Sequence, residues 1–209
     1  MPSDIIKLNL VNASADCNNS SIVLFQRNMV SSIQEIAVAW LVIDNLGIGW
    51  SHEFTYDYTL QVSAADSWGN RVPAKSSANG QLWKVVRDCS GDQLQLAGDA
   101  SVPTEVQIQN GLTLGAISAN IYRSGTLLAT KTGVAPGQMA AFKFNPNICI
   151  GVVSQVEQGA ILDSAILSTV NTTLALTGLA SADIVMSGGG PGRNSAPFTF
   201  TLQNKVFMS

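Results

Sequence analysis

The stretch that decides the fold class is Glu53–Val62, EFTYDYTLQV. Its apolar side chains occupy every second position, namely Phe54, Tyr56, Tyr58, Leu60 and Val62. Polar residues fill the positions between them, and successive side chains of a β-strand point to opposite faces. The alternation therefore predicts a strand with one face in the core and the other in solvent.

Apolar runs separated by turn residues predict the other strands. Ser21–Phe25 and Ile36–Ile43 are continuously apolar, which indicates a strand covered on both faces or, for Ile36–Ile43, a short buried helix. A tight hairpin is expected where Ser124-Gly125 separates Ile117–Arg123 from Thr126–Lys131, because glycine supplies the positive φ of such turns. Further strands are expected at Gly80–Val86, Gln138–Phe144, Ile148–Val153, Ser164–Thr177, Ala180–Met186 and Phe198–Leu202.

Helical patterns are scarce, and Val30–Glu35 offers one or two turns at most. Many short strands with Gly and Pro between them are typical of sandwiches and barrels. A length of 209 residues suits one all-β domain, and no linker is visible. We predict a single-domain antiparallel β-sandwich over residues 1–209, with barrel-like closure as the alternative.

The chain carries little charge. Only 12% of its residues are Asp, Glu, Lys or Arg, about half of the ~25% typical of soluble domains, while 46% are hydrophobic. The net charge is −3, and the Lys and Arg residues are scattered singly. Neutralising phosphates takes a basic stripe, so we expect no nucleic-acid partner. Few charges also weaken repulsion between copies and lower the desolvation cost of burying surface.

His52 is the only histidine. Hydrolytic, redox and metal sites usually combine several His, Asp, Glu, Lys or Cys side chains, and an iron site with two histidines cannot be built from one. No G-x-S-x-G motif for a nucleophilic serine occurs either. We predict that the protein is not an enzyme and uses no catalytic residue, cofactor or metal.

An enzyme with a concealed carboxylate or metal site is kept as an alternative. The carboxylates that could form a pair for glycoside hydrolysis are Glu53, Asp57 and Glu105. Oxygen ligands for calcium could come from Asp88, Asp92 and Asp99, which lie around glycines. The spacing of an EF-hand is absent, so capping of turns is the favoured role of these three aspartates.

Cys17, Cys89 and Cys149 are far apart and form no C-x-x-C pair. We expect small buried hydrophobic residues, with one disulfide and a free thiol as the alternative. Met1–Leu10 lacks the pattern of a cleavable signal peptide, and no apolar run is long enough for a transmembrane helix. We therefore expect a protein that is cytoplasmic when made or is released by a signal-independent route.

Trp50 and Trp68 each lie within turn signals and are expected to be exposed. Exposed aromatic rings serve sugar-binding proteins as stacking platforms, so both are candidate ligand-binding residues of a lectin-like site. Tyr56 and Tyr58 share the apolar face of their strand and are expected in the core.

Ser187–Asn194, SGGGPGRN, is rich in glycine but lacks the P-loop motif. Its backbone N–H groups could hold an anion with Arg193 as the counter-charge, which makes Arg193 a third candidate ligand-binding residue. A flexible connection between strands is the favoured interpretation.

The C-terminal third is almost uncharged, and Ser164–Thr177 alternates imperfectly between apolar and hydroxyl side chains. The apolar side is formed by Ile166, Val170, Leu174 and Leu176. Uncharged, hydroxyl-rich strands of this kind are what β-pore-forming toxins insert, and a spanning strand needs ~9–11 residues. These four residues are candidates for membrane insertion within a hairpin over Ser164–Met186. An ordinary sandwich strand has the same alternation.

The composition favours a non-catalytic β-sandwich that binds or self-assembles through a surface of low charge. Its expected partners are glycans, a protein receptor or its own copies in a homo-oligomer. The alternative is a component of a β-pore-forming toxin, insecticidal or cytolytic, that oligomerises on a target membrane. An unrecognised enzyme is the second alternative.

Overall fold

The computed structural model describes residues 5–30, 37–170, 172–192 and 195–208. Strands make up 59% of the chain and helix 3%, which confirms the all-β prediction. Residues 31–35 of the helical turn expected at Val30–Glu35, and Ile36 at the start of the next predicted strand, lie outside the described residues.

The described chain forms two compact units. Unit 1 comprises the described residues within Met1–Gln26, Ala37–Tyr58 and Pro146–Ser209, and unit 2 those within Arg27–Ile36 and Thr59–Asn145. The chain thus passes back and forth between them. One domain over residues 1–209 stays a prediction, because compactness alone does not show whether the two units unfold together.

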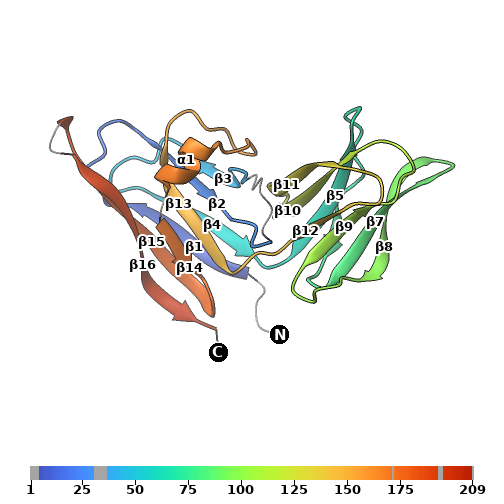
Figure 1. Ribbon diagram of the computed structural model, residues 1–209. Helices are drawn as coiled ribbons and strands as arrows, with labels where there is room; N and C mark the ends of the chain where they lie inside the picture. The colour runs from blue at the N-terminus through green and yellow to red at the C-terminus, as the bar shows by residue number, and fades with distance from the viewer. Residues whose placement is uncertain (1–4, 31–36, 171, 193–194, 209) are drawn as a thin grey trace. The chain divides into compact units, whose positions relative to one another are not determined.

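Unit 1 consists of two four-stranded sheets and a short helix (Figure 1). Its elements are β1 (Ile5–Asn12), β2 (Ser21–Phe25), β3 (Leu41–Ile43), β4 (Ser51–Asp57), β13 (Asn147–Val153), α1 (Ser164–Thr169), β14 (Thr172–Ala175), β15 (Leu179–Gly189) and β16 (Ala196–Phe207). One sheet has the order β16-β15-β1-β4 and the other the order β14-β13-β2-β3.

Unit 2 consists of two further four-stranded sheets (Figure 1). Its strands are β5 (Leu60–Asp66), β6 (Lys75–Ser77), β7 (Gln81–Asp88), β8 (Gly91–Asp99), β9 (Val106–Asn110), β10 (Ile117–Arg123), β11 (Thr126–Val134) and β12 (Met139–Phe142). The sheet orders are β11-β10-β5-β6 and β12-β9-β7-β8.

Each unit contains a parallel strand pair, which departs from the predicted purely antiparallel sandwich. β1 pairs with β15, and β7 with β9, in parallel, whereas the other ladders between described strands are antiparallel. Each sheet of described strands ends in two edge strands, so the sheets are open and the alternative of closure is not realised.

The stretch Glu53–Val62 is two strands, which corrects the prediction of one. β4 ends at Asp57 and β5 begins at Leu60, and the two strands belong to different units. Tyr56, Leu60 and Val62 are buried as predicted, whereas Tyr58 is 37% exposed and packs edge-on against Tyr56. The alternation concealed the break because Leu60 resumes the pattern in phase.

β2 confirms the prediction of a strand covered on both faces, since four consecutive side chains, Ile22 to Phe25, are buried. Val23 and Phe25 face a cluster that includes Cys149 and Val170, against which the α1 side chains pack. Only Leu41–Ile43 of the other apolar run is a strand. Residues 37–40 are buried without forming a strand or a helix there.

The strand predicted over Ser164–Thr177 is wrong, because this segment begins as helix α1 and only continues as β14. The Asp163 carboxylate caps the helix by accepting a hydrogen bond from the backbone N–H of Ile166, at 2.8 Å. Val170 is the C-cap residue, its backbone N–H donates to the Ile166 carbonyl at 3.1 Å, and Ile166 packs against the buried cluster to which Val170 belongs. No helix within the described residues has the length and apolar character needed to cross a membrane.

The hairpin at Ser124-Gly125 is confirmed. Both residues have positive φ, 51° and 77°, and the flanking residues Arg123 and Thr126 are paired. Two consecutive positive φ values are what a type I′ turn requires, so local sequence was sufficient here.

Candidate functional site

The structure places Trp50 and Trp68 on the surface, as predicted. Their side chains are 69% and 88% exposed, but Trp50 belongs to unit 1 and Trp68 to unit 2. The third candidate ligand-binding residue, Arg193, lies outside the described residues. The two tryptophans are therefore considered separately.

Trp50 closes a turn that the buried side chain of Asn12 holds in place. Asn12 Nδ2 donates to the carbonyl of Leu46 at 2.7 Å. The Asn12 backbone N–H donates to the Trp50 carbonyl at 2.9 Å, and the Gly49 N–H donates to the Asn12 carbonyl at 2.7 Å. Three hydrogen bonds between Asn12 of β1 and the turn thus hold the turn while the Trp50 ring stays exposed.

Trp68 lies in a turn organised by Asp66 at the end of β5. Asp66 Oδ1 accepts hydrogen bonds from the backbone N–H groups of Trp68 and Asn70, each at 2.9 Å, and Oδ2 accepts from Asn70 Nδ2 at 2.8 Å. These bonds, the side-chain one from Asn70 first, hold the pKa of Asp66 below its ordinary value. The carboxylate is therefore an ionised part of the turn.

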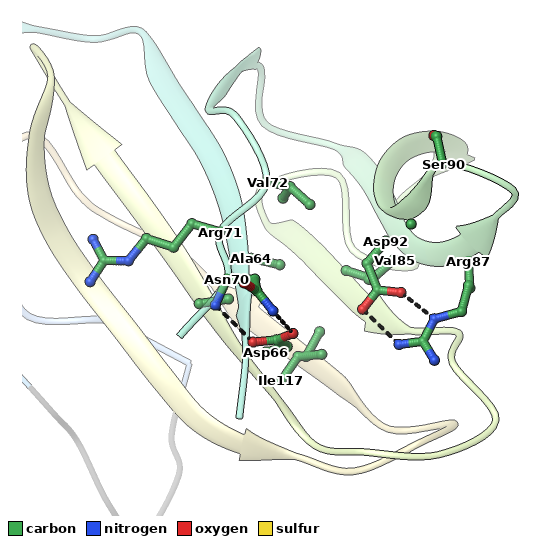
Figure 2. A pocket seen from close by; sticks show the side chains of 12 residues that line it. Ala64, Asp66, Asn70, Arg71, Val72, Val85, Arg87, Ser90, Asp92 and Ile117 are labelled. Carbon is green, nitrogen blue, oxygen red and sulfur yellow. Dashed lines mark hydrogen bonds and ion pairs between the residues drawn. The ribbon is translucent and has the colours of Figure 1, made fainter. Parts of the chain in front are cut away.

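A pocket of about 360 Å³ lies beside this turn, where residues from both sheets of unit 2 meet (Figure 2). Apolar side chains of β5, β7 and β10 and of the β5–β6 connection form part of its lining: Ala64, Val72, Val85 and Ile117. Its polar lining consists of Asp66, Asn70, Arg71, Arg87, Ser90 and Asp92. The pocket thus combines apolar surface with paired hydrogen-bonding groups.

Arg87 and Asp92 form the ion pair of this pocket. They oppose each other on β7 and β8. Arg87 Nε lies 2.6 Å from Asp92 Oδ1 and Nη2 lies 3.1 Å from Oδ2, a two-point contact that Figure 2 shows as two dashed lines. The hydrogen bond to Asp92 and the negative charge of Asp92 raise the pKa of Arg87 above its ordinary value.

Arg71 supplies a second cation. Its guanidinium extends away from Asp66 and Asn70 in Figure 2. Within the described part of the chain, no hydrogen bond or ion pair engages its side chain. With Asp66 and Asp92, the two arginines bring the formal charge of the lining to zero.

The residues considered for catalysis or metal binding do not gather into one group. Glu53 and Asp57 lie on β4 in unit 1, and Glu105 belongs to unit 2. His52 is an exposed residue of β4. Among described residues, no three or more His, Cys, Asp and Glu side chains are grouped to hold a metal ion.

The aspartates considered as alternative calcium ligands have other partners or positions. Asp88 accepts hydrogen bonds from the backbone N–H and the hydroxyl of Ser90, both at 2.7 Å, which lowers its pKa. Asp92 is paired with Arg87, and Asp99 lies at the far end of β8. Capping of the β7–β8 turn thus accounts for Asp88.

The cysteines are only partly as predicted. Cys149 is buried, but Cys17 and Cys89 are exposed, and all three are free thiols. The expectation of small buried residues is wrong for Cys17 and Cys89, because both lie in turns between strands rather than on a core-facing strand.

Sequence reasoning placed Trp68 in a turn but did not predict the pocket beside that turn. Asn70, Arg71 and Arg87 were not singled out, although the hairpin around Ser90-Gly91 could have indicated that Arg87 opposes Asp92. No local sequence pattern indicates that Ile117 of β10 lines the pocket.

Comparison of the chain with protein-family models, with curated proteins and with solved structures finds no match.

Proposed function

We propose that the chain is a non-catalytic binding protein whose unit 2 holds a neutral saccharide in the pocket beside the Asp66–Asn70 turn. One observation carries the proposal. A pocket with an apolar and a charge-balanced polar lining adjoins a turn whose tryptophan, Trp68, is 88% exposed.

The lining matches the two surfaces of a sugar. A sugar ring has a face of C–H groups, which suits the Ala64, Val72, Val85 and Ile117 surface, and an edge of hydroxyl groups, which suits the amide, carboxylate and guanidinium groups. The volume falls in the ~300–1,000 Å³ range of ligand pockets. Because the formal charges of the lining cancel, the pocket has no surplus charge that would favour an anion or a cation over a neutral ligand.

Trp68 provides the stacking surface in this proposal. Burying an aromatic side chain removes ~150–250 Å² from water, roughly 4–6 kcal/mol of gross transfer energy. A folded protein that leaves this surface exposed forgoes that stabilisation. Asp66 fixes the backbone of the turn before any ligand binds, which lowers the ordering cost of binding.

The carboxylates of the pocket suit recognition better than proton transfer. A general acid needs a pKa near the working pH, whereas hydrogen bonds lower the pKa of Asp66. Asp92 is held by Arg87 in a two-point contact. We assign both the role of orienting groups for ligand hydroxyls.

Binding to an immobilised panel of neutral oligosaccharides tests the proposal. We expect at least one neutral glycan to bind, and Trp68→Ala to weaken that binding about tenfold or more, which is about 1.4 kcal/mol. Asp92→Ala is expected to weaken it too. Trp50→Ala is the matched control, because it removes an exposed indole from the other unit.

Two results would overturn the proposal. One is the absence of binding to every neutral glycan on the panel. The other is binding that survives unchanged in both Trp68→Ala and Asp92→Ala, with folding of each variant verified by circular dichroism.

A further inference from the structure

We propose that unit 1 carries a second binding site, a polar groove on the outer face of the β16-β15-β1-β4 sheet that takes an oligosaccharide bearing free amino groups. The site goes beyond the function proposed for unit 2, since none of its residues belongs to that unit.

The groove has a volume of about 610 Å³ and is lined by residues of all four strands of the sheet. Strand register sets its polar side chains in two rows. Glu53, Asn9 and Asp183 are directly opposite one another on β4, β1 and β15, and Thr55, Lys7 and Ser181 form the next row. Sites built on strands are held more precisely than sites on loops.

Asp183 is fixed between two amides from its neighbouring strands. Asn9 Nδ2 on β1 donates to Asp183 Oδ1 at 3.1 Å, and Asn204 Nδ2 on β16 donates to Oδ2 at 2.6 Å. Reversing either amide would turn its oxygen toward the carboxylate, so the negative charge dictates both orientations. Each amide therefore donates an N–H group to Asp183, and its oxygen points away from the carboxylate.

The groove presents hydrogen-bond acceptors to a ligand. Asn9 Oδ1 is buried and, within the described chain, has no hydrogen-bond partner, so it lies out of a ligand's reach and the accessible amide oxygen is that of the exposed Asn204. Glu53 adds a carboxylate that forms no ion pair with a described residue. A ligand that complements this surface therefore has to bring donors.

The charges of the groove specify the donor further. Lys7 contributes one positive charge and Glu53 and Asp183 contribute two negative charges, so the formal charge of the lining is −1. A protonated amine is a donor and a cation at once, and hydrogen bonds to a carboxylate are stronger when the donor is charged. Hydroxyl groups on the same ligand can donate to Asn204 Oδ1 and accept from Lys7. An amino sugar satisfies these requirements, because it carries protonated amines and hydroxyl groups on one molecule.

Isothermal titration calorimetry with a glucosamine hexamer at pH 6 tests the site, with the fully N-acetylated hexamer as the uncharged comparison. We expect the glucosamine hexamer to bind at least tenfold more tightly. Asp183→Asn and Glu53→Gln are each expected to weaken its binding tenfold or more. Glu157→Gln, an exposed carboxylate of unit 1 outside the groove, is the matched control.

Two further measurements complete the experiment: the salt dependence of binding and binding by the unit 2 variant Trp68→Ala. Binding of the amine is expected to weaken from 0.05 M to 0.5 M NaCl, because salt screens exposed charges, and to persist in Trp68→Ala. If Asp183→Asn does not fold, Glu53→Gln still decides, since Glu53 is exposed. If Trp68→Ala were the only variant that lost binding of the glucosamine hexamer, that binding would belong to unit 2. The proposed site in the groove would then be overturned.

The proposal is also overturned by three other results. They are no binding of the glucosamine hexamer, equal binding of both hexamers, and binding that neither groove substitution changes. None of these results contradicts the neutral saccharide proposed for the pocket of unit 2.

Discussion

At the scale of single residues, Asp66 shows how one carboxylate prepares a recognition surface. Its two oxygens together accept three hydrogen bonds within the Asp66–Asn70 turn. Trp68 is held by its backbone while its side chain stays exposed. The turn therefore presents an apolar ring without needing to bury it in a core.

The lowered pKa of Asp66 makes a prediction about acid stability. A carboxylate whose folded-state pKa is depressed stabilises the fold above its unfolded-state pKa, ~3.9 for Asp. That contribution is lost as the pH falls through the folded-state pKa. We expect Asp66→Asn to flatten the decline of the melting temperature below about pH 4, measured from pH 2 to 7.

Asp88 also has a lowered pKa, so part of the acid decline is expected to remain in Asp66→Asn. Asp99→Asn is the control, because Asp99 is an exposed carboxylate of unit 2 outside the turn. Superimposable acid curves for the native protein and Asp66→Asn would contradict the stabilising role of Asp66.

At the scale of elements, the segment after α1 packs closely on β13. A Cβ atom placed on Gly151 would lie 2.7 Å from Val170 Cγ2, closer than side-chain carbons pack. Val170 belongs to the same buried cluster as Val23 and Cys149. Glycine at position 151 thus permits the contact that anchors the end of α1.

Gly151→Ala is therefore expected to lower the free energy of unfolding by about 1–3 kcal/mol, the usual cost of overpacking. Val170→Ala removes the colliding methyl groups, so the double variant should lose less than the sum of the two single variants. Urea unfolding of all four proteins measures the difference. Strict additivity would show that Gly151 and Val170 do not compete for the same space.

The same segment bears on the toxin alternative, which stays a prediction. Three of the four candidate insertion residues, Val170, Leu174 and Leu176, are buried in unit 1, and Ile166 is half-buried. Insertion of the Ser164–Met186 hairpin would require α1 to unwind and these side chains to leave the core.

At the scale of the whole molecule, low charge and open sheet edges favour association between copies. The 12-residue edge strand β16 carries one charged residue, Lys205. Unpaired strand edges are templates for pairing with another chain, and charge is what commonly protects them. Phe207, at the end of β16, is 64% exposed.

We accordingly expect a homo-oligomer in solution. Light scattering coupled to size-exclusion chromatography should give a mass that is a multiple of 22.0 kDa. Because few charges are involved, raising the salt concentration should not dissociate it. A mass of one chain at every protein concentration would contradict this prediction.

Local patterns carried the sequence predictions that succeeded. Ser124-Gly125 and the apolar run Ser21–Phe25 specify their structures within a few residues. Tyr58 and Ser164 mark where such patterns failed. A strand break that preserves alternation and a capped helix with mixed periodicity both need tertiary contacts to distinguish them from a continuous strand.

By itself, the sequence determined the all-β class, the tight hairpin and the exposure of Trp50 and Trp68, because side-chain alternation and turn geometry act between neighbours in the chain. Tertiary structure alone decided the two units, the parallel ladders and the membership of the pocket and the groove. Asn9 and Asp183 are 174 residues apart in sequence yet share a hydrogen bond. Such a pairing follows from the free energy of the folded sheet as a whole, which no local pattern records.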